Sequence, residues 1–183
     1  MLTGRKDPAL GRGEVSFMER ETSCCFTGHR RISPQDGLWL RRMLRQEILR
    51  MAQEGVRSFL AGGALGFDTM AAQEVLRMRA EYLPDLELVL VLPCVGQEEK
   101  WRQRDAAVYR ALLRQADQVI YTSTQRQKAC MGRRNRFLVD HSAYCICYQV
   151  TPRGGTAYTV QYARNQVLQV SNLAEKVRGE KDK

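Results

Sequence analysis

Short apolar runs alternate along the chain with longer segments in which apolar residues recur every three or four positions. The runs predict strands at residues 23–27, 58–61, 87–92, 118–121, 144–148 and 167–173. Residues 87–92 are almost entirely apolar, which is typical of a central strand covered on both faces. This pattern predicts a parallel sheet.

The longer segments predict amphipathic helices. The first begins at Ser33 and Pro34, a capping residue followed by proline at the first helical position, and it ends at Gly55. The others are predicted at residues 68–81, 101–115, 134–142 and 156–164. Strands and helices that alternate at this spacing predict one α/β domain, a Rossmann-like, open and mainly parallel doubly wound sheet with helices on both faces.

Both ends of the chain lack this periodicity. Residues 1–21 mix Gly, Arg, Asp and Glu, and we expect a disordered leader there, or a segment upstream of a true start at Met18. Residues 174–183 are rich in charge and are expected to fray. The folded domain is therefore predicted at residues 22–173, which is long enough to bury a sizeable core.

Two glycine-bearing turns, each between an apolar run and a predicted helix, indicate a binding site. Free backbone N–H groups at a helix start, together with the helix dipole, attract anions. Ligands of doubly wound sheets bind beyond the carboxyl ends of the strands, so we expect both turns to meet at one anionic ligand. Asp68 either caps its helix or contacts the ligand, and Thr156 serves as a cap, a phosphate contact or both. The candidate residues are Gly62, Gly63, Gly66, Asp68, Gly154, Gly155 and Thr156.

Two basic segments are predicted at the same edge of the sheet. One leaves the first strand directly, and the other begins a predicted helix, where positive charges oppose the helix dipole unless an anion or carboxylates balance them. Asp105 and Asp140 are candidate partners, so an Arg–Asp network is the alternative to a ligand. The candidate binding residues in these segments are Gly28, His29, Arg30, Arg133, Arg134 and Asn135.

The composition supports an anionic ligand without specifying it. The formal net charge is +9, and 23 arginines outnumber 6 lysines. The planar guanidinium binds phosphate and carboxylate groups in a bidentate manner, although the same composition also fits a generally basic surface. Trp101 and Tyr109 lie at apolar spacing and are expected in the core rather than as platforms for bases.

The cysteines and the hydropathy pattern bear on metal binding and location. The sequence has six cysteines but no C-x-x-C pair, and it has only two histidines, so we expect no metal site. Those in the predicted strands are expected to be buried thiols in a reducing cytoplasm, and Cys94 and Cys130 leave a reactive thiol near the site as an alternative. Because there is no long apolar stretch and no signal-peptide pattern, we expect a cytoplasmic protein without membrane insertion.

Five segments in this order closely resemble the YpsA-like family of the SLOG superfamily. They are residues 25–30, 62–68, 92–94, 130–137 and 154–156, and the resemblance spans about residues 24–173. That superfamily includes the LOG phosphoribohydrolases and the DprA/Smf DNA-processing proteins. The resemblance implies a Rossmann-like fold, a pocket for a nucleotide or nucleotide-derived ligand with no required cofactor, and a homodimer or higher oligomer. It also implies a sensing role, linked in some bacteria to stress and cell division.

The chain departs from the LOG hydrolases where catalysis is concerned. Their P-G-G-x-G-T-x-x-E segment ends in a glutamate that assists departure of the base, and Thr159 stands at that position here. Of their M-H-x-R-K segment only Met131 and Arg134 are matched. We therefore expect nucleotide binding or sensing. The alternatives are an N-glycosidase of nucleoside monophosphates, with Asp68 or Asp105 as substitute catalytic groups, and binding of single-stranded DNA, which the net charge favours.

Overall fold

Six parallel strands form one sheet in the part of the chain that the computed structural model describes, residues 19–124 and 129–176. The strands are β1 (Ser23–Gly28), β2 (Ser58–Ala61), β3 (Glu87–Leu92), β4 (Gln118–Tyr121), β5 (Tyr144–Tyr148) and β6 (Gln169–Asn172). Their order is β4-β3-β2-β1-β5-β6, and every neighbouring pair is parallel. The predicted Rossmann-like α/β fold is confirmed.

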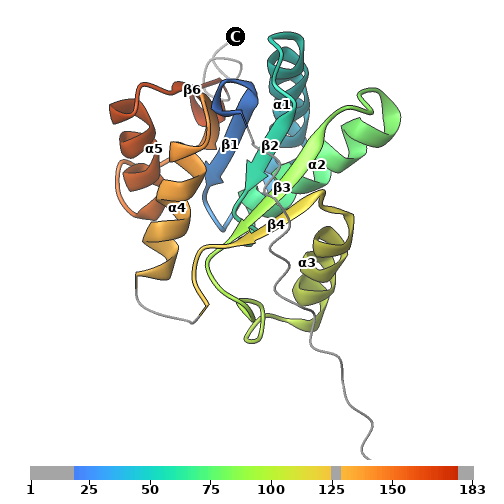
Figure 1. The fold of residues 1–183 in the computed structure, drawn as a ribbon, viewed down its shortest axis with the longest axis vertical. Coiled ribbons are helices and arrows are strands. Elements are labelled where there is room, and N and C mark those ends of the chain that lie inside the picture. The colour runs from blue at the N-terminus through green and yellow to red at the C-terminus, as the bar shows by residue number, and fades with distance from the viewer. Residues whose placement is uncertain (1–18, 125–128, 177–183) are drawn as a thin grey trace, which may run out of the picture.

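Helices cover both faces of the sheet (Figure 1). They include α1 (Pro34–Gln53), α2 (Phe67–Glu81), α3 (Gln103–Gln115), α4 (Cys130–Asp140) and α5 (Gly155–Asn165). A short 3-10 turn, η1 (Arg20–Thr22), precedes β1, and residues 173–176 are also helical. Helices α4 and α5 lie on one face, and α1, α2 and α3 lie on the other (Figure 1). The molecule is thus a three-layer sandwich with the sheet in the middle.

Each face of the sheet buries its own apolar cluster. In β3, Leu88, Leu90 and Leu92 pack on the side of α1 and α2, while Val89 and Val91 pack on the side of α4 and α5. Successive side chains of a strand point to opposite faces, so a strand buried on both sides must be apolar throughout. This explains the continuous apolar run at this position in the sequence.

The direction of the chain connections changes between β1 and β5, which are neighbours in the sheet. The chain leaves β1 for α1 on one face, and it leaves β5 for α5 on the other. Such a switch point leaves a crevice beyond the carboxyl ends of the two strands, and ligands of doubly wound folds bind there. The fold therefore directs attention to the residues that follow β1 and β5.

Three predicted boundaries were wrong. Helix α4 begins at Cys130 rather than at residue 134, because the buried Cys130 extends its apolar face by a turn. Helix α3 begins at Gln103, and Trp101 lies just before it, edge-on to the buried ring of Tyr109 at 5.3 Å between centroids. The last strand is shorter than predicted, since Val167 adopts a φ of 61° and ends the preceding turn.

The predicted leader and tail lie largely outside the described residues. Within 19–21, Arg20 and Glu21 belong to η1. Within 174–176, Ala174 is buried, and Lys176 Nζ lies 2.5 Å from Glu47 Oε2 on α1. The first residues of the predicted tail thus contact the domain.

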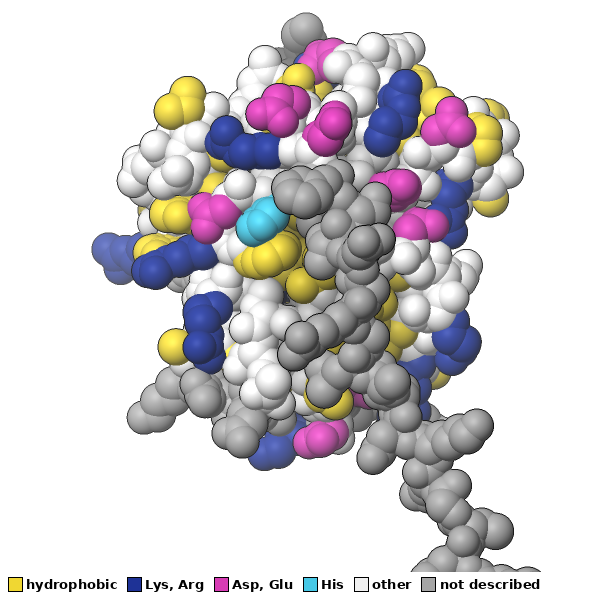
Figure 2. Space-filling view, viewed as in Figure 1, with side chains coloured by type: hydrophobic (Ala, Val, Ile, Leu, Met, Phe, Trp, Pro, Cys, Tyr) yellow, Lys and Arg dark blue, Asp and Glu magenta, His cyan; other side chains and the backbone are white. Residues whose placement is uncertain are grey.

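The surface and the cysteines complete the description. All six cysteines lie in the described segments and are buried, so the predicted burial of the four strand cysteines is confirmed. Within these segments, no helix combines the length and apolar character that crossing a membrane requires. On the face in Figure 2, lysine and arginine side chains are interspersed with acidic ones and do not form one continuous basic patch.

Candidate functional site

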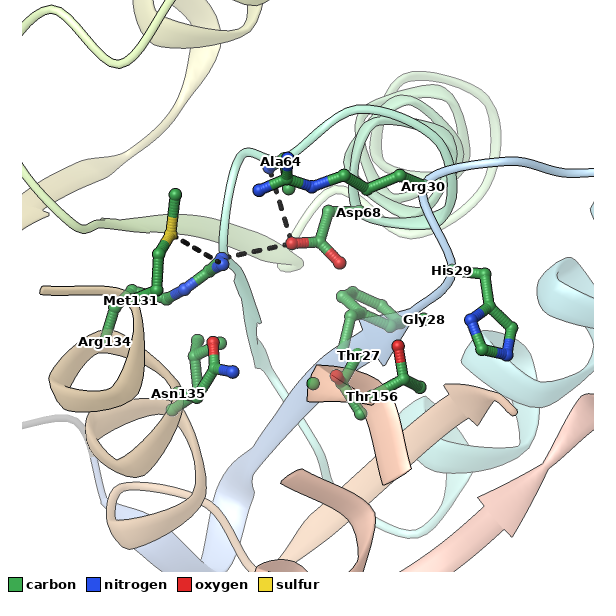
Figure 3. A pocket seen from close by; sticks show the side chains of 13 residues that line it. Thr27, Gly28, His29, Arg30, Ala64, Asp68, Met131, Arg134, Asn135 and Thr156 are labelled. Carbon is green, nitrogen blue, oxygen red and sulfur yellow. Dashed lines mark hydrogen bonds and ion pairs between the residues drawn. The ribbon is translucent and has the colours of Figure 1, made fainter. Parts of the chain in front are cut away.

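A cavity of about 360 Å³ opens beyond the carboxyl end of β1, between α4 and the start of α5 (Figure 3). This is the crevice that the switch between β1 and β5 creates. The residues that line it are Phe26, Thr27, Gly28, His29, Arg30, Ala64, Asp68, Met131, Arg134, Asn135, Leu138, Gly155 and Thr156. Asp68 is the acidic group among them, and Arg30 and Arg134 are cationic, so the wall of the cavity carries net positive charge.

A buried ion pair forms one wall of the cavity. Arg134 Nη1 donates to Asp68 Oδ2 at 3.1 Å, and both side chains are 7% exposed. The backbone N–H of Ala64 donates to the same oxygen at 3.4 Å. Burial raises the pKa of the Asp68 carboxyl, and the positive charge of Arg134 partly offsets that effect. The carboxylate that pairs with Arg134 is therefore Asp68 rather than the predicted Asp105 or Asp140.

Arg134 reaches Asp68 because Gly62 has no side chain. A Cβ atom at Gly62 would lie 1.2 Å from Nη1 of Arg134, so the guanidinium occupies that space. Nη2 is 3.8 Å from the sulfur of Met131, and the buried Nε–H has no hydrogen-bond partner among the described residues. An unpaired N–H of a buried cation on a cavity wall is costly unless an acceptor is present, and it marks a place where a ligand oxygen fits.

The first glycine turn, residues 62–66, is packed rather than open. A Cβ at Gly63 would meet Leu92 at 2.6 Å, and the buried amide of Gln97 donates to the carbonyl of Gly63 at 3.1 Å. Gly66 has a φ of 81°, and a Cβ there would lie 2.3 Å from the backbone oxygen of Arg30. Asp68 does not cap the start of α2. This turn serves close packing between β2, α2 and the loop after β1.

The second glycine turn is open. Gly154 has a φ of 93° and stands before the first residue of α5, and nothing lies within 4 Å of a Cβ built at Gly154 or Gly155. The first helical bond donor here is Tyr158, so the N–H groups of the preceding residues are available at the helix start. Gly155 and Thr156 line the cavity, and no side chain caps the helix. This helix start is the feature best suited to hold an anion.

Thr159, at the position of the LOG glutamate, links α4 to α5 instead. Its side chain is 1% exposed, it accepts from Asn135 Nδ2 at 2.9 Å, and its hydroxyl donates to the carbonyl of Gly155 at 2.9 Å. The bond fixes the first turn of α5 against the helix that carries Arg134. Thr159 thus has a structural role, because it joins α4 to the first turn of α5.

His29 connects the loop after β1 to the loop before α5. The backbone N–H of Val150 donates to His29 Nε2 at 2.9 Å, and the carbonyl of His29 accepts from the N–H of Phe67 at 3.1 Å. Burial lowers the pKa of the imidazole, which favours the neutral ring. Figure 3 shows Arg30 reaching toward Ala64, above the carboxylate of Asp68.

The structure brings most of the predicted site residues together. Those that line the cavity are Gly28, His29, Arg30, Asp68, Arg134, Asn135, Gly155 and Thr156. Those that do not are Gly62, Gly63, Gly66, Arg133 and Gly154. Arg133 is exposed and donates to Ser123 Oγ at 3.3 Å. Asp105 lies in the first turn of α3, and Cys94 and Cys130 are buried outside the cavity lining.

Sequence reasoning missed five lining residues. They are Phe26, Thr27, Ala64, Met131 and Leu138. Helical spacing was a usable signal for two of them, since Met131 and Leu138 lie one turn before and one turn after the pair Arg134 and Asn135. No cluster of three or more metal-ligating His, Cys, Asp or Glu side chains occurs within residues 19–124 and 129–176.

Comparisons with known protein families and sequences agree with this architecture. A model of the YspA SLOG family (YpsA) matches residues 34–176. A UPF0398 protein of Brevibacillus brevis is 30% identical over 105 residues, which is 56% of this chain and 55% of that protein. A UPF0398 protein of Bacillus cereus is 29% identical over 134 residues, which is 69% of this chain and 70% of that protein. The chain therefore spans about half the length of the Brevibacillus relative and more of the Bacillus one.

Solved structures share the fold. The DNA processing protein A of Helicobacter pylori, described for its single-stranded DNA binding mode, superimposes with a TM-score of 0.60 at 18% identity, covering 86% of this chain and 67% of that one. The DNA processing protein A of Streptococcus pneumoniae gives a TM-score of 0.58 at 16% identity, covering 84% of this chain and 50% of that one. At these identities the likeness concerns the fold alone.

Proposed function

Because this chain belongs to the YspA SLOG family, we propose that the cavity beyond β1 binds a nucleotide or nucleotide derivative. The phosphate lies at the start of α5, at the backbone N–H groups of Gly155 and Thr156, and the guanidinium of Arg134 is its charge partner. The observation that carries the proposal is the buried, unpaired Nε–H of Arg134 on the wall of this cavity. A phosphate oxygen would satisfy that donor, and its negative charge would offset the net positive charge of the cavity wall.

Ligand-dependent thermal unfolding tests the proposal. A ligand at about 100 times its dissociation constant stabilises the folded state by about 2.7 kcal/mol. For a chain of this size that stabilisation raises the melting temperature by about 5 °C or more. The panel comprises nucleoside mono-, di- and triphosphates, dinucleotides and ADP-ribose, and mass spectrometry of molecules released from natively purified protein complements it. Flat melting curves across the panel, with no released ligand, would contradict nucleotide binding.

Two conservative variants in the same helix sharpen the test. Arg134→Lys keeps a cation for Asp68 but lacks the Nε–H and the planar fork of the guanidinium. The apparent affinity for the nucleotide, derived from the thermal shifts, should therefore fall about tenfold. Arg136→Lys is the matched control, because Arg136 is exposed and contacts Tyr158 rather than the cavity. Equal losses in both variants would show that the effect is not specific to the cavity.

We favour binding over N-glycoside hydrolysis. Thr159 replaces the glutamate that the LOG resemblance requires, and it is engaged with Asn135 and Gly155. Asp68 is the acidic group on the cavity wall, and it pairs with Arg134. Release of free base from a ribonucleotide by wild-type protein, lost in Asp68→Asn, would turn the proposal into an enzyme with Asp68 as its acid or base.

The same proposal extends to biological role and assembly. We propose that ligand occupancy is read as a signal in the cytoplasm, in the control of stress responses or cell division, by a homodimer or higher oligomer. Six cysteines, all of them buried, support a reducing compartment. Light scattering with and without the bound nucleotide measures the oligomer.

Tight, length-dependent binding of oligo(dT) at physiological salt would favour the single-stranded DNA alternative instead.

A further inference from the structure

The protonation of His29 follows from a single backbone hydrogen bond. The N–H of Val150 lies 2.9 Å from His29 Nε2. A backbone N–H can only donate, so Nε2 must accept and carries no proton. In the neutral imidazole the proton then resides on Nδ1. The loop before α5 therefore selects the Nδ1–H tautomer.

The Nδ1–H faces the cavity. Figure 3 shows His29 at the rim of the cavity. Its Nδ1, the ring nitrogen nearer to Cβ, lies on the side of Thr156, and its Nε2 is turned away. Among the described residues, none accepts a hydrogen bond from Nδ1. The site thus presents a second N–H donor without a protein partner, in addition to the buried Nε–H of Arg134.

The imidazole is held in this orientation from three sides. The His29 N–H donates to the carbonyl of Tyr148 at 3.3 Å, and its own carbonyl accepts from Phe67 at 3.1 Å. The ring stands edge-on to Tyr148 at 6.1 Å between centroids. Because backbone and ring are both anchored, a ligand gains this hydrogen bond without the cost of ordering the side chain.

We propose that His29 is a ligand-binding residue that donates its Nδ1–H to a phosphate oxygen at the start of α5. The N–H groups of Gly155 and Thr156 hold the phosphate from the side of α5, and the neutral donor of His29 holds it from the loop after β1. The inference rests on the proposed function and deepens it, since it names a further group, the Nδ1–H of His29, that recognises the phosphate.

Nitrogen NMR of the histidine rings tests the inference directly. The chain has two histidines, His29 and His141, so the ring signals of uniformly ¹⁵N-labelled protein can be assigned with one His141→Gln variant. Without ligand, the signals of His29 should identify the Nδ1–H tautomer. On addition of adenosine, guanosine, cytidine or uridine 5′-monophosphate, the Nδ1–H signal should shift together with the amides of Gly155 and Thr156.

The outcomes separate the two proposals. Amide shifts at Gly155 and Thr156 with an unchanged His29 ring would overturn the inference and leave nucleotide binding standing. An Nε2–H tautomer in the free protein would also overturn it. If no nucleotide of the thermal panel shifts the amides or the ring, both proposals fail. Inorganic phosphate as a separate probe distinguishes recognition of the phosphate alone from recognition of the ester.

Two isosteric variants supply an independent readout. The amide nitrogen of Asn superimposes on Nδ1, and a Gln side chain reaches the position of Nε2. His29→Asn keeps a donor toward the cavity but loses the acceptor for Val150, and should bind the monophosphate within about threefold of wild type. His29→Gln keeps the acceptor but loses the donor, and its affinity should fall about tenfold or more. The reverse order would assign His29 to loop positioning and overturn the inference.

Discussion

The two glycine turns look alike in sequence and differ in the folded protein. In the turn at residues 62–66, side chains and backbone from elsewhere fill the space beside the glycines, from Arg134, Gln97 and the loop at Arg30. In the turn at residues 154–156, nothing lies within 4 Å of a Cβ built on either glycine, and the helix start opens onto the cavity. One turn uses glycine to let other groups approach, and the other leaves backbone N–H groups accessible.

A glycine turn before a helix is therefore not by itself an anion site. The first turn contributes to the site indirectly, because Gly62 makes room for the guanidinium of Arg134. The second turn contributes its own backbone. Substitutions in the first turn should therefore lower folding stability, and affect binding only through Arg134, whereas substitutions in the second should leave folding stability nearly unchanged.

Gly66→Ala should have the largest effect. The position combines a φ of 81° with a Cβ that would lie 2.3 Å from a backbone oxygen, which cannot move aside as a side chain can. Strain and overpacking together should lower the free energy of unfolding by about 3 kcal/mol or more, measured by urea denaturation. Gly132→Ala in α4, where nothing lies within 4 Å, is the control and should stabilise by about 0.5 kcal/mol. If Gly66→Ala lowers the free energy of unfolding by less than about 1 kcal/mol, the first turn is not as tightly packed as we state.

Gly62→Ala should rank second and should affect binding as well. A methyl group displaces the tip of Arg134, which is flexible, but Asp68 then loses its buried partner. We expect about 2 kcal/mol lower stability in urea and loss of nucleotide-induced stabilisation in the thermal assay. Unchanged nucleotide binding in this variant would show that Arg134 is not the charge partner of the ligand.

Thr159→Val tests the support beneath the second turn. The variant is nearly isosteric but removes the hydroxyl that joins Asn135 to the carbonyl of Gly155. Stability should fall by about 1 kcal/mol, because one buried hydrogen-bonding link is lost. Thr151→Val in the exposed loop serves as control and should change stability by less than about 0.5 kcal/mol. Equal effects at both positions would argue against a special role for Thr159.

Acid pH should weaken the link that His29 makes between the loop after β1 and the loop before α5. Its folded-state pKa lies below the ordinary value of 6.5, because burial disfavours the charged ring. The contribution to stability is therefore complete above pH 6.5 and is lost as the pH falls through the folded-state pKa. Urea unfolding from about pH 7.5 to about pH 5.5 should show a larger loss for wild type than for His29→Gln, which does not titrate. Parallel pH profiles would contradict this.

Gly155→Ala should have the smallest effect on stability. The added methyl meets no atom within 4 Å, and the position is the first of α5. The free energy of unfolding should change by less than about 0.5 kcal/mol in urea. A large loss would mean that the second turn is as tightly constrained as the first, and the distinction between the two would disappear.

The sequence predicted most of the fold because the relevant signal is local. Alternation in strands and the spacing of three and four in helices report which face of each element is buried. The error at α4 arose where that signal is weak, since its first turn contains Met131 and Gly132 beside arginines. The sequence also placed Gly155, Thr156, His29 and Arg134 at one edge of the sheet, because residues after parallel strands meet there.

The amino-acid sequence by itself determined the order of the elements, the parallel sheet and the edge at which the site forms. Only the tertiary structure decided that Arg134 pairs with Asp68, 66 residues away, that the first glycine turn is filled and the second open, and that Thr159 joins Asn135. Periodicity records how each segment is buried along its own axis. Which side chain fills a given space depends on how distant segments pack against one another, and the pattern of a single segment does not contain that information.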